Sequence, residues 1–218
     1  MIIDSRYQVI TNLGTGLYAS VFKVRDIRTD QIYSLKLFNH LEAGAFYEEL
    51  NAESMHHITK LRHPNLLHIY NFGNWDTHIY YLAEFYQGTN LKNFRFNPQK
   101  YSMLYDLIVQ IVYALDALHN QNILHKDIKP ENIMYSIVDQ KIRIKVLDYG
   151  FNKMDTERNQ QRISGTLPYI APEIYAGESG SPESDFYALG VTLYYILTQT
   201  LPFSQDQISE IIQGEYKN

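Results

Sequence analysis

The segment HKDIKPEN, His125 to Asn132, decides how the rest of this sequence is interpreted. It places a carboxylate at Asp127, a lysine two residues later at Lys129 and an amide at Asn132. A base, a cation and a metal ligand on one short loop are the parts that phosphoryl transfer requires. Any one of these residues alone would fit a polar surface turn around Pro130. The complete string is far more specific, and it predicts a site for phosphoryl transfer.

The composition of the 218 residues is that of a globular protein, because 45% are hydrophobic and 14% aromatic. Nineteen basic and 24 acidic residues give a formal net charge of −5, and the sequence has no basic run. Nucleic acid is therefore not an expected partner. The sequence contains no cysteine, which excludes disulfides, thiolate metal sites and a cysteine nucleophile.

No membrane partner and a cytoplasmic location are expected. The longest strongly apolar run, Ala188 to Leu197, is far shorter than the ~20 residues that span a bilayer. The amino-terminal MIIDSRYQ lacks the charged and apolar blocks of a signal peptide. The sequence gives no indication of the oligomeric state.

The HKDIKPEN segment resembles the catalytic loop of the eukaryotic-type protein kinases, His-Arg-Asp-Leu-Lys-Pro-Glu-Asn, in its serine/threonine form. The resemblance implies that Asp127 orients a substrate hydroxyl and accepts its proton. It also implies that Lys129 neutralises charge on the γ-phosphate and that Asn132 binds magnesium. Lys126 departs from the pattern, since most members have arginine there and lysine cannot form arginine's bidentate fork with a phosphate. Activation by phosphorylation of the following loop is therefore not expected.

Short alternating runs from Tyr7 to Leu37 predict three antiparallel strands. The segment GTGLYASV follows the first strand, and Gly14 and Gly16 would let backbone N–H groups approach phosphate oxygens. A plain hairpin turn fits this segment equally well. It also departs from the kinase pattern Gly-x-Gly-x-x-Gly, because the third glycine is Ala19.

The third strand carries YSLK where kinases have Val-Ala-Ile-Lys, so Lys36 stands at the place of the lysine that reaches the α- and β-phosphates. A solvated surface lysine is the alternative. The same match implies that Val21 and Ser34 form the roof over the adenine.

The next segment, Ala45 to Leu61, has helical period and is ended by His63-Pro64-Asn65. Kinases place a glutamate on this helix to pair with the strand lysine. When the positions of the predicted helix are counted back from its last apolar residues, this glutamate is expected at position 54, which is a serine. The nearest glutamate is Glu53, and Glu49 lies one turn earlier. Glu53 is the predicted partner, with the other two positions left open.

Strands between Leu66 and Phe85 would complete a five-stranded sheet, with a hinge at 85–90 after it. The resemblance implies further nucleotide contacts in and beyond this region. They are Ala83 at the back of the pocket, the backbones of Glu84 and Tyr86 at the adenine, Asn90 near the ribose, and Met134 and Leu147 below the adenine.

In the second half of the sequence, the pattern of apolar residues predicts one short and one long helix within 91–122. A hairpin that turns at Asp139-Gln140 is predicted after the catalytic loop. The hairpin leads to Asp148-Tyr149-Gly150, the counterpart of Asp-Phe-Gly, so Asp148 would bind magnesium. Thr166, within GTLPY, would bridge Asp127 and Lys129. A buried helix with a serine cap is predicted from Ser184 to Thr198, and its Asp185 would anchor the catalytic-loop backbone.

The resemblance covers roughly residues 7–214 and implies an α+β, bilobal protein-kinase-like fold. Residues 1–84 would form the N-lobe, 85–90 the hinge and 91–218 an incomplete C-lobe, so that the chain is either a fragment or a shortened domain. The implied activity is ATP- and Mg²⁺-dependent phosphorylation of a protein serine or threonine. The alternative is a pseudokinase that binds nucleotide as a scaffold, which the departures at Ala19, Lys126 and Tyr149 would suit.

Overall fold

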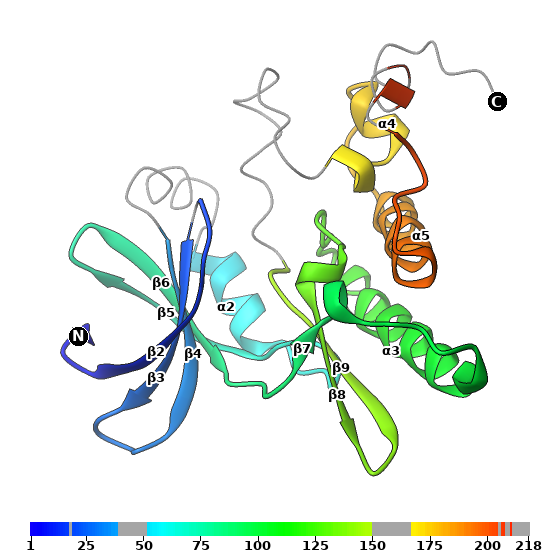
Figure 1. Ribbon diagram of the computed structural model, residues 1–218. Coiled ribbons are helices and arrows are strands. Elements are labelled where there is room, and N and C mark those ends of the chain that lie inside the picture. The colour runs from blue at the N-terminus through cyan, green and yellow to red at the C-terminus, as the bar shows by residue number, and fades with distance from the viewer. Residues whose placement is uncertain (18, 39–51, 150–166, 205, 208–209, 211–218) are drawn as a thin grey trace. The chain divides into compact units, whose positions relative to one another are not determined.

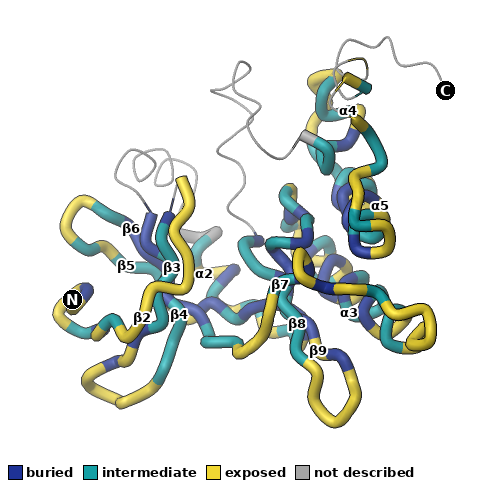
Figure 2. The backbone as a smooth tube through the Cα atoms, viewed as in Figure 1, coloured by how far each residue is buried: buried dark blue, intermediate teal, exposed yellow. Residues whose placement is uncertain are grey.

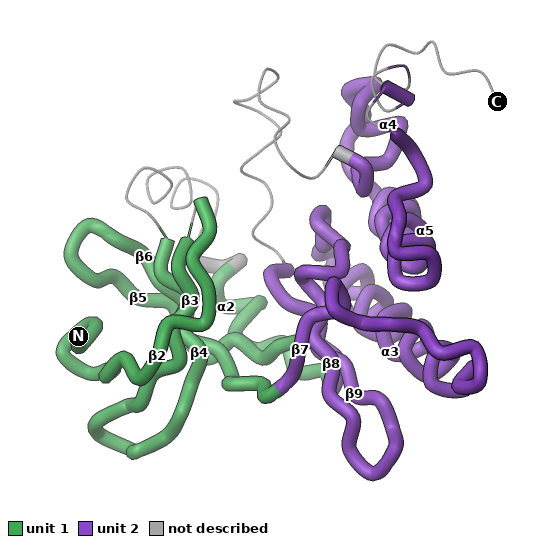
Figure 3. The backbone as a smooth tube through the Cα atoms, viewed as in Figure 1, with its two compact units in different colours: residues 1–63, 67–87 green, residues 64–66, 88–218 purple. Residues whose placement is uncertain are grey.

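A computed structural model describes residues 1–17, 19–38, 52–149, 167–204, 206–207 and 210 (Figure 1). Buried residues of this part of the chain concentrate along the strands and along one side of the longer helices (Figure 2). The chain forms two compact units (Figure 3): unit 1 comprises residues 1–63 and 67–87, and unit 2 comprises 64–66 and 88–218.

Unit 1 is built on an antiparallel sheet with the strand order β1-β2-β3-β4-β6-β5. The expected five strands are therefore six, because Ile2 and Ile3 pair with Gln8 and Tyr7 as an additional edge strand. Two residues are too few to show a period of two, so alternation could not reveal this strand. The strands are β1 (Ile2–Ile3), β2 (Tyr7–Thr15), β3 (Ala19–Asp26), β4 (Ile32–Phe38), β5 (Ile69–Trp75) and β6 (His78–Glu84).

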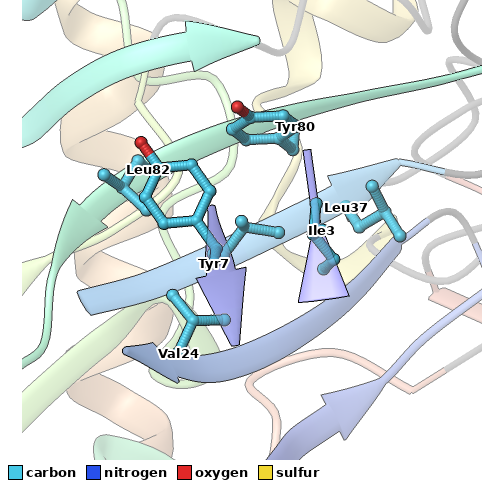
Figure 4. Close-up of a cluster of buried hydrophobic side chains, with 7 residues drawn as sticks. Ile3, Tyr7, Val24, Leu37, Tyr80 and Leu82 are labelled. Carbon is cyan, nitrogen blue, oxygen red and sulfur yellow. The ribbon is translucent and has the colours of Figure 1, made fainter. Parts of the chain in front are cut away.

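One face of this sheet carries the hydrophobic core of unit 1 (Figure 4). The rings of Tyr7 and Tyr80 meet edge to face, with their centroids 5.9 Å apart. Leu35 and Leu37 of β4 belong to the same cluster. Since side chains alternate between the faces of a strand, the intervening residue Lys36 and its neighbour Ser34 lie on the opposite face. The cluster consists of Ile3, Tyr7, Val24, Leu35, Leu37, Tyr80 and Leu82.

The described helix of unit 1 is α2 (Ala52–Lys60), which packs on β5 and buries Ile58. The helical period was expected to begin at Ala45, but residues 39–51 lie outside the described part. The helix ends before His63-Pro64, as the proline predicts.

In unit 2 the long helix α3 (Tyr101–His119) packs against the second strand of a hairpin. The hairpin turns at Asp139-Gln140, whose φ angles of 50° and 62° suit the type I′ turn that matches the twist of paired strands. The short helix expected near residue 91 is replaced by two 3₁₀ turns. The segments are β7 (Thr89–Asn90), η1 (Leu91–Asn93), η2 (Pro98–Lys100), η3 (Pro130–Asn132), β8 (Ile133–Val138) and β9 (Lys141–Val146).

The rest of unit 2 contains η4 (Leu167–Tyr169), α4 (Pro172–Tyr175) and α5 (Pro182–Thr198). Helix α5 begins two residues before its predicted start, because Ser181 is the N-cap residue and Pro182 takes the first helical position. The backbone N–H of Ser181 donates to Ser184 Oγ at 3.1 Å. The predicted buried helix is therefore present, with a shifted start.

One helical stretch of the described chain, Pro98–His119, is long and apolar enough to cross a membrane by length and composition alone. It is longer than the apolar run that the sequence pointed to. Its buried stripe packs within unit 2, as in the core helix of a globular domain, and consists of Leu107, Ile111, Ala114, Leu115 and Leu118.

Candidate active site

The backbone of the HKDIKPEN loop is held by Asp185, a residue of α5 that is 1% exposed. The backbone N–H of His125 donates to Asp185 Oδ2, and that of Lys126 donates to Oδ1, both at 2.8 Å. His119, at the end of α3, places Nε2 2.8 Å from Oδ2. Lys126 adopts φ = 64°, so the two bonds hold a conformation that non-glycine residues seldom adopt. One buried carboxylate thus fixes the start of the loop.

His125 connects this loop to the segment that contains Asp148. Its ring is fully buried, and burial lowers the pKa of the imidazole. Nε2 donates to the carbonyl oxygen of Leu147 at 2.8 Å, and the N–H of Asp127 donates to Nδ1 at 3.3 Å. Both contacts suit a neutral ring with its proton on Nε2. The residue before Asp148 and the backbone of Asp127 are therefore held by one side chain.

The carboxylate of Asp127 is the centre of the loop's polar groups. Lys129 Nζ lies 2.6 Å from Asp127 Oδ2, and Asn132 Nδ2 donates to the same oxygen at 2.7 Å. Asn132 Nδ2 also lies 2.8 Å from the carbonyl oxygen of Asp127. Pro130 starts the 3₁₀ turn η3 that brings Asn132 back over Asp127. The structure thus brings together the three residues that the loop sequence singled out.

Asn132 and Asp148 form a donor set that fits magnesium. The N–H of Leu147 donates to the carbonyl oxygen of Asn132 at 2.8 Å, which brings Asp148 next to Asn132 in the fold. Asp148 has φ = 57°, a left-handed conformation that aspartate tolerates better than most residues. Mg²⁺ prefers oxygen ligands and is commonly held by one or two carboxylates together with substrate phosphates. The described residues contain no cluster of three acidic or histidine side chains, and a site of this kind does not need one.

In unit 1, four of the predicted nucleotide-binding residues share one face of the sheet. Val21 of β3 lies opposite Lys36 of β4, and Ala83 of β6 lies opposite Ser34 of β4. Their face is the one turned away from the hydrophobic cluster, because Leu35 and Leu37 occupy the other face. The sheet thus presents a lysine and three small or aliphatic residues on a common surface.

The glycine segment forms the turn between β2 and β3. The N–H of Gly14 donates to Asn12 Oδ1 at 2.8 Å, and the N–H of Gly16 donates to the carbonyl oxygen of Ala19 at 2.9 Å. Within the part of the chain that the structure describes, no atom comes within 4 Å of a Cβ placed on Gly14. The register also places Gly14 opposite Val21.

The remaining nucleotide-contact predictions fall at the end of β6 and around β7. Glu84 and Tyr86 are half-buried, as is Leu147. Asn90 lies opposite Met134 in the β7–β8 pair. Asn90 Oδ1 is buried and has no hydrogen-bond partner among the described residues.

The structure does not show the side chains of two predicted site residues. Thr166 lies outside the described residues. Glu53 lies in α2, but its side chain is not described, so its pairing with Lys36 stays a prediction. Sequence reasoning missed the roles of His125 and His119, because neither the chemistry assigned to the loop nor a position at a helix end indicates which distant groups a histidine contacts.

Comparison with known proteins identifies the family. The family model for the protein kinase domain matches residues 7–218. The chain belongs to the protein kinase domain family. The expected family and the expected bilobal α+β fold are thereby confirmed, except for the number of strands. The kinase domain of PknI from Mycobacterium tuberculosis has the same fold, with a TM-score of 0.73 at 20% identity over 94% of this chain and 78% of that one.

Curated relatives of this kinase domain include serine/threonine kinases. PrkC of Bacillus subtilis is 31% identical over 216 residues, which are 96% of this chain and 33% of PrkC. Myosin light chain kinase A of Dictyostelium discoideum is 28% identical over 97% of this chain and 72% of its own length. The chain therefore spans about a third of the length of PrkC, the relative with the higher identity of the two.

Proposed function

We propose that this kinase domain transfers the γ-phosphoryl group of ATP to a serine or threonine hydroxyl of a protein substrate, with magnesium. The observation that carries the proposal is the arrangement around Asp127, whose Oδ2 lies 2.6 Å from Lys129 Nζ and 2.7 Å from Asn132 Nδ2. The backbone N–H of Leu147, the residue before Asp148, is bonded to Asn132, which supports a role for the Asp148 carboxylate at the same site. Relatives such as PrkC, named as serine/threonine kinases, support the substrate class.

Each side chain has a separate task in this proposal. Both described contacts of the Asp127 carboxylate involve Oδ2, so Oδ1 is the oxygen that receives the proton of the substrate hydroxyl. Lys129, which pairs with this carboxylate, neutralises charge on the transferred phosphoryl group. Magnesium, when held by Asp148 and Asn132, supplies charge neutralisation at the phosphates. Lys36 binds the α- and β-phosphates, and the proposal requires it to act on the same ATP molecule as the loop.

A phosphotransfer assay with labelled ATP, Mg²⁺ and a generic serine/threonine protein substrate tests this function. We expect the parent chain to label the substrate. Asp127→Ala should lower kcat by about 100-fold or more, the typical contribution of a positioned base. Asp148→Asn should remove the magnesium-dependent activity.

The matched control is Asp139→Asn, because it makes the same change of charge at the exposed tip of the β8–β9 hairpin. Asparagine also suits the positive φ of this position, so its activity should equal that of the parent. If the parent binds Mg²⁺ and ATP without any transfer, the proposal is wrong and a nucleotide-binding scaffold is the better description. Full activity in Asp127→Ala would also contradict the proposal.

A further inference from the structure

Unit 2 contains an apolar pocket beside β8 and the segment that leads into α3, with a volume of about 260 Å³. None of the residues assigned to phosphoryl transfer lines it. Most of its walls are aromatic and aliphatic side chains, namely Phe94, Phe96, Met103, Tyr135 and Ile137. The rings of Phe94 and Tyr135 meet edge to face, with their centroids 5.3 Å apart. A packed aromatic pair therefore bounds the pocket.

The pocket continues the hydrophobic layer between the β8–β9 hairpin and α3, and the described residues leave this end of the layer open. Ile137 lies opposite Ile142 in the hairpin, so both side chains point to the same face of the sheet. Ile142 is 2% exposed, whereas Ile137 is 55% exposed. A ligand that fills the pocket would remove the apolar surface of Ile137 from water, which favours binding.

The charged groups at this pocket are cations. Arg95 and Lys100 line it, and no lining residue is acidic. Arg95 donates from Nη1 to the carbonyl oxygens of Lys92 and Phe94, at 3.1 and 2.9 Å, and these bonds hold its guanidinium group in place. Neither Arg95 nor Lys100 forms an ion pair with another residue that the structure describes. Since the whole chain carries a net charge of −5, the two cations form a local positive site on an acidic protein.

The size and charge of the pocket indicate its occupant. Pockets for drug-sized ligands usually measure about 300–1,000 Å³, so this one suits a single large side chain. An aromatic residue that fills such a pocket supplies much of the affinity in many protein interfaces. The two cations are complementary to carboxylates on either side of that residue.

We propose that this pocket binds an acidic peptide segment of another protein. One aromatic side chain of the segment fills the pocket, and its flanking carboxylates meet Arg95 and Lys100. The site is separate from the loop that contains Asp127, and the inference does not depend on the proposed phosphoryl transfer.

The test measures binding of a fluorescent peptide to the whole chain by anisotropy, without nucleotide. The peptide has one phenylalanine between glutamate and aspartate residues. Two comparison peptides replace the phenylalanine by alanine, or all the acidic residues by lysine. We expect the acidic phenylalanine peptide to bind with a dissociation constant of about 10–100 µM, since small interfaces are usually weak. Each comparison peptide should bind about tenfold less tightly or worse.

Ile137→Ser should weaken binding of the acidic phenylalanine peptide by about fivefold, because it removes one apolar wall of the pocket. Val138→Ser is the matched control. Val138 is 53% exposed, lies on the opposite face of β8 and does not line the pocket, so its replacement should leave the affinity unchanged.

A second pair of variants tests the charges. Arg95→Gln combined with Lys100→Gln should weaken binding by about fivefold at low salt, because two partly exposed ion pairs are lost. Arg28→Gln combined with Lys60→Gln removes the same charges from exposed positions of unit 1. This control should bind the peptide as the parent does.

Several outcomes would overturn the proposal. They are equal binding by Ile137→Ser and Val138→Ser, equal binding of the acidic and lysine peptides, and no binding by the folded parent at about 1 mM. If circular dichroism shows that Ile137→Ser does not fold, the charge variants and the comparison peptides decide. If sedimentation shows that the parent self-associates and that Ile137→Ser prevents it, the pocket binds a second copy of the chain and the proposal is wrong.

Discussion

Asp26, at the end of β3, shows how one buried charge contributes to the stability of unit 1. Its carboxylate is fully buried, and Arg6 donates to Oδ2 from Nε at 3.0 Å and from Nη2 at 2.7 Å. The N–H of Arg28 donates to Oδ1 at 2.9 Å. These bonds, above all those from Arg6, lower the pKa of Asp26 to about 2. The charged carboxylate is thus part of the folded structure at all but strongly acidic pH.

We expect Asp26→Asn to lower the free energy of unfolding at neutral pH by about 2 kcal/mol, the typical value for hydrogen bonds to a charged group. A carboxyl group whose pKa is lowered on folding stabilises the folded state above its unfolded pKa, near 3.8, and loses this contribution as the pH falls toward 2. The difference between parent and variant in urea unfolding should therefore be smaller at pH 3 than at pH 6.

Asp30→Asn is the control for this experiment. Its side chain is 84% exposed and meets Arg25 at 3.5 Å, so the same change should alter stability by no more than about 0.5 kcal/mol. A parent-to-variant difference for Asp26→Asn that is constant between pH 6 and pH 3 would contradict the assignment of the low pKa to this residue.

At the scale of elements, the pairing of β5 with β6 depends on a glycine. Gly73 lies opposite Tyr80, and a Cβ at position 73 would overlap the ring of Tyr80. That ring is 1% exposed, and its hydroxyl donates to Asp4 Oδ2 at 2.6 Å. The ring cannot move aside without breaking this bond and disturbing the hydrophobic cluster of unit 1.

Gly73→Ala should therefore destabilise the chain by about 1–3 kcal/mol, as overpacking of a core usually does. The measurement is the midpoint of thermal or urea unfolding. Gly190→Ala is the matched control, because Gly190 lies within α5 and a Cβ there would meet no described atom within 4 Å apart from the neighbouring backbone of its own helix. That substitution should stabilise the helix by about 0.5–1 kcal/mol. Equal effects of the two changes would show that the contact with Tyr80 does not matter.

Elements with a strong local signature were predictable from the sequence. The hairpin at Asp139-Gln140 and the helix α3 have the turn residues and the period that define them. The strand Ile2–Ile3 was missed because two residues carry no period. The 3₁₀ turns η1 and η2 replace a helix because the backbone is extended at Phe94, where η1 ends, and at Asn97, which precedes Pro98.

The same distinction applies to the candidate site. Asp127, Lys129 and Asn132 could be selected together because they are neighbours in the sequence and their types suit one kind of chemistry. The contact between Ser34 and Glu84 joins residues 50 positions apart, and that between His125 and Leu147 joins residues 22 apart. No local pattern encodes such pairs, since they depend on strand register and on how a loop closes.

At the scale of the whole molecule, each of the two units has its own buried core. The loop residues 64–66 belong to unit 2 although helix α2 before them belongs to unit 1. The reason is that the N–H of Val146 donates to the carbonyl oxygen of Asn65 at 2.8 Å, and Asn65 Nδ2 donates to Gln110 Oε1 at 2.9 Å. The chain thus enters unit 2 once before its main crossing at residues 87–88.

The helix α3 could be mistaken for a membrane span, and its contacts argue against that role. Gln110, in the middle of the helix, donates from Nε2 to the carbonyl oxygen of Ile142 at 3.0 Å, and its Oε1 accepts from Ile144 N at 3.3 Å. Inside a bilayer this amide would lose these partners. Asp106 and Asp116 are exposed on the same helix, and an aspartate at the centre of a spanning helix costs about 3 kcal/mol.

We therefore expect this chain to stay in the unfloated fraction when it is floated with neutral lipid vesicles. Its net charge of −5 also disfavours anionic vesicles. Asp106→Leu with Asp116→Leu makes the outer face of α3 apolar and is the matched comparison, since only this double variant should gain affinity for vesicles. Flotation of the parent that survives a high-salt wash would show that α3 enters the bilayer, because salt removes electrostatic attachment and leaves apolar insertion intact.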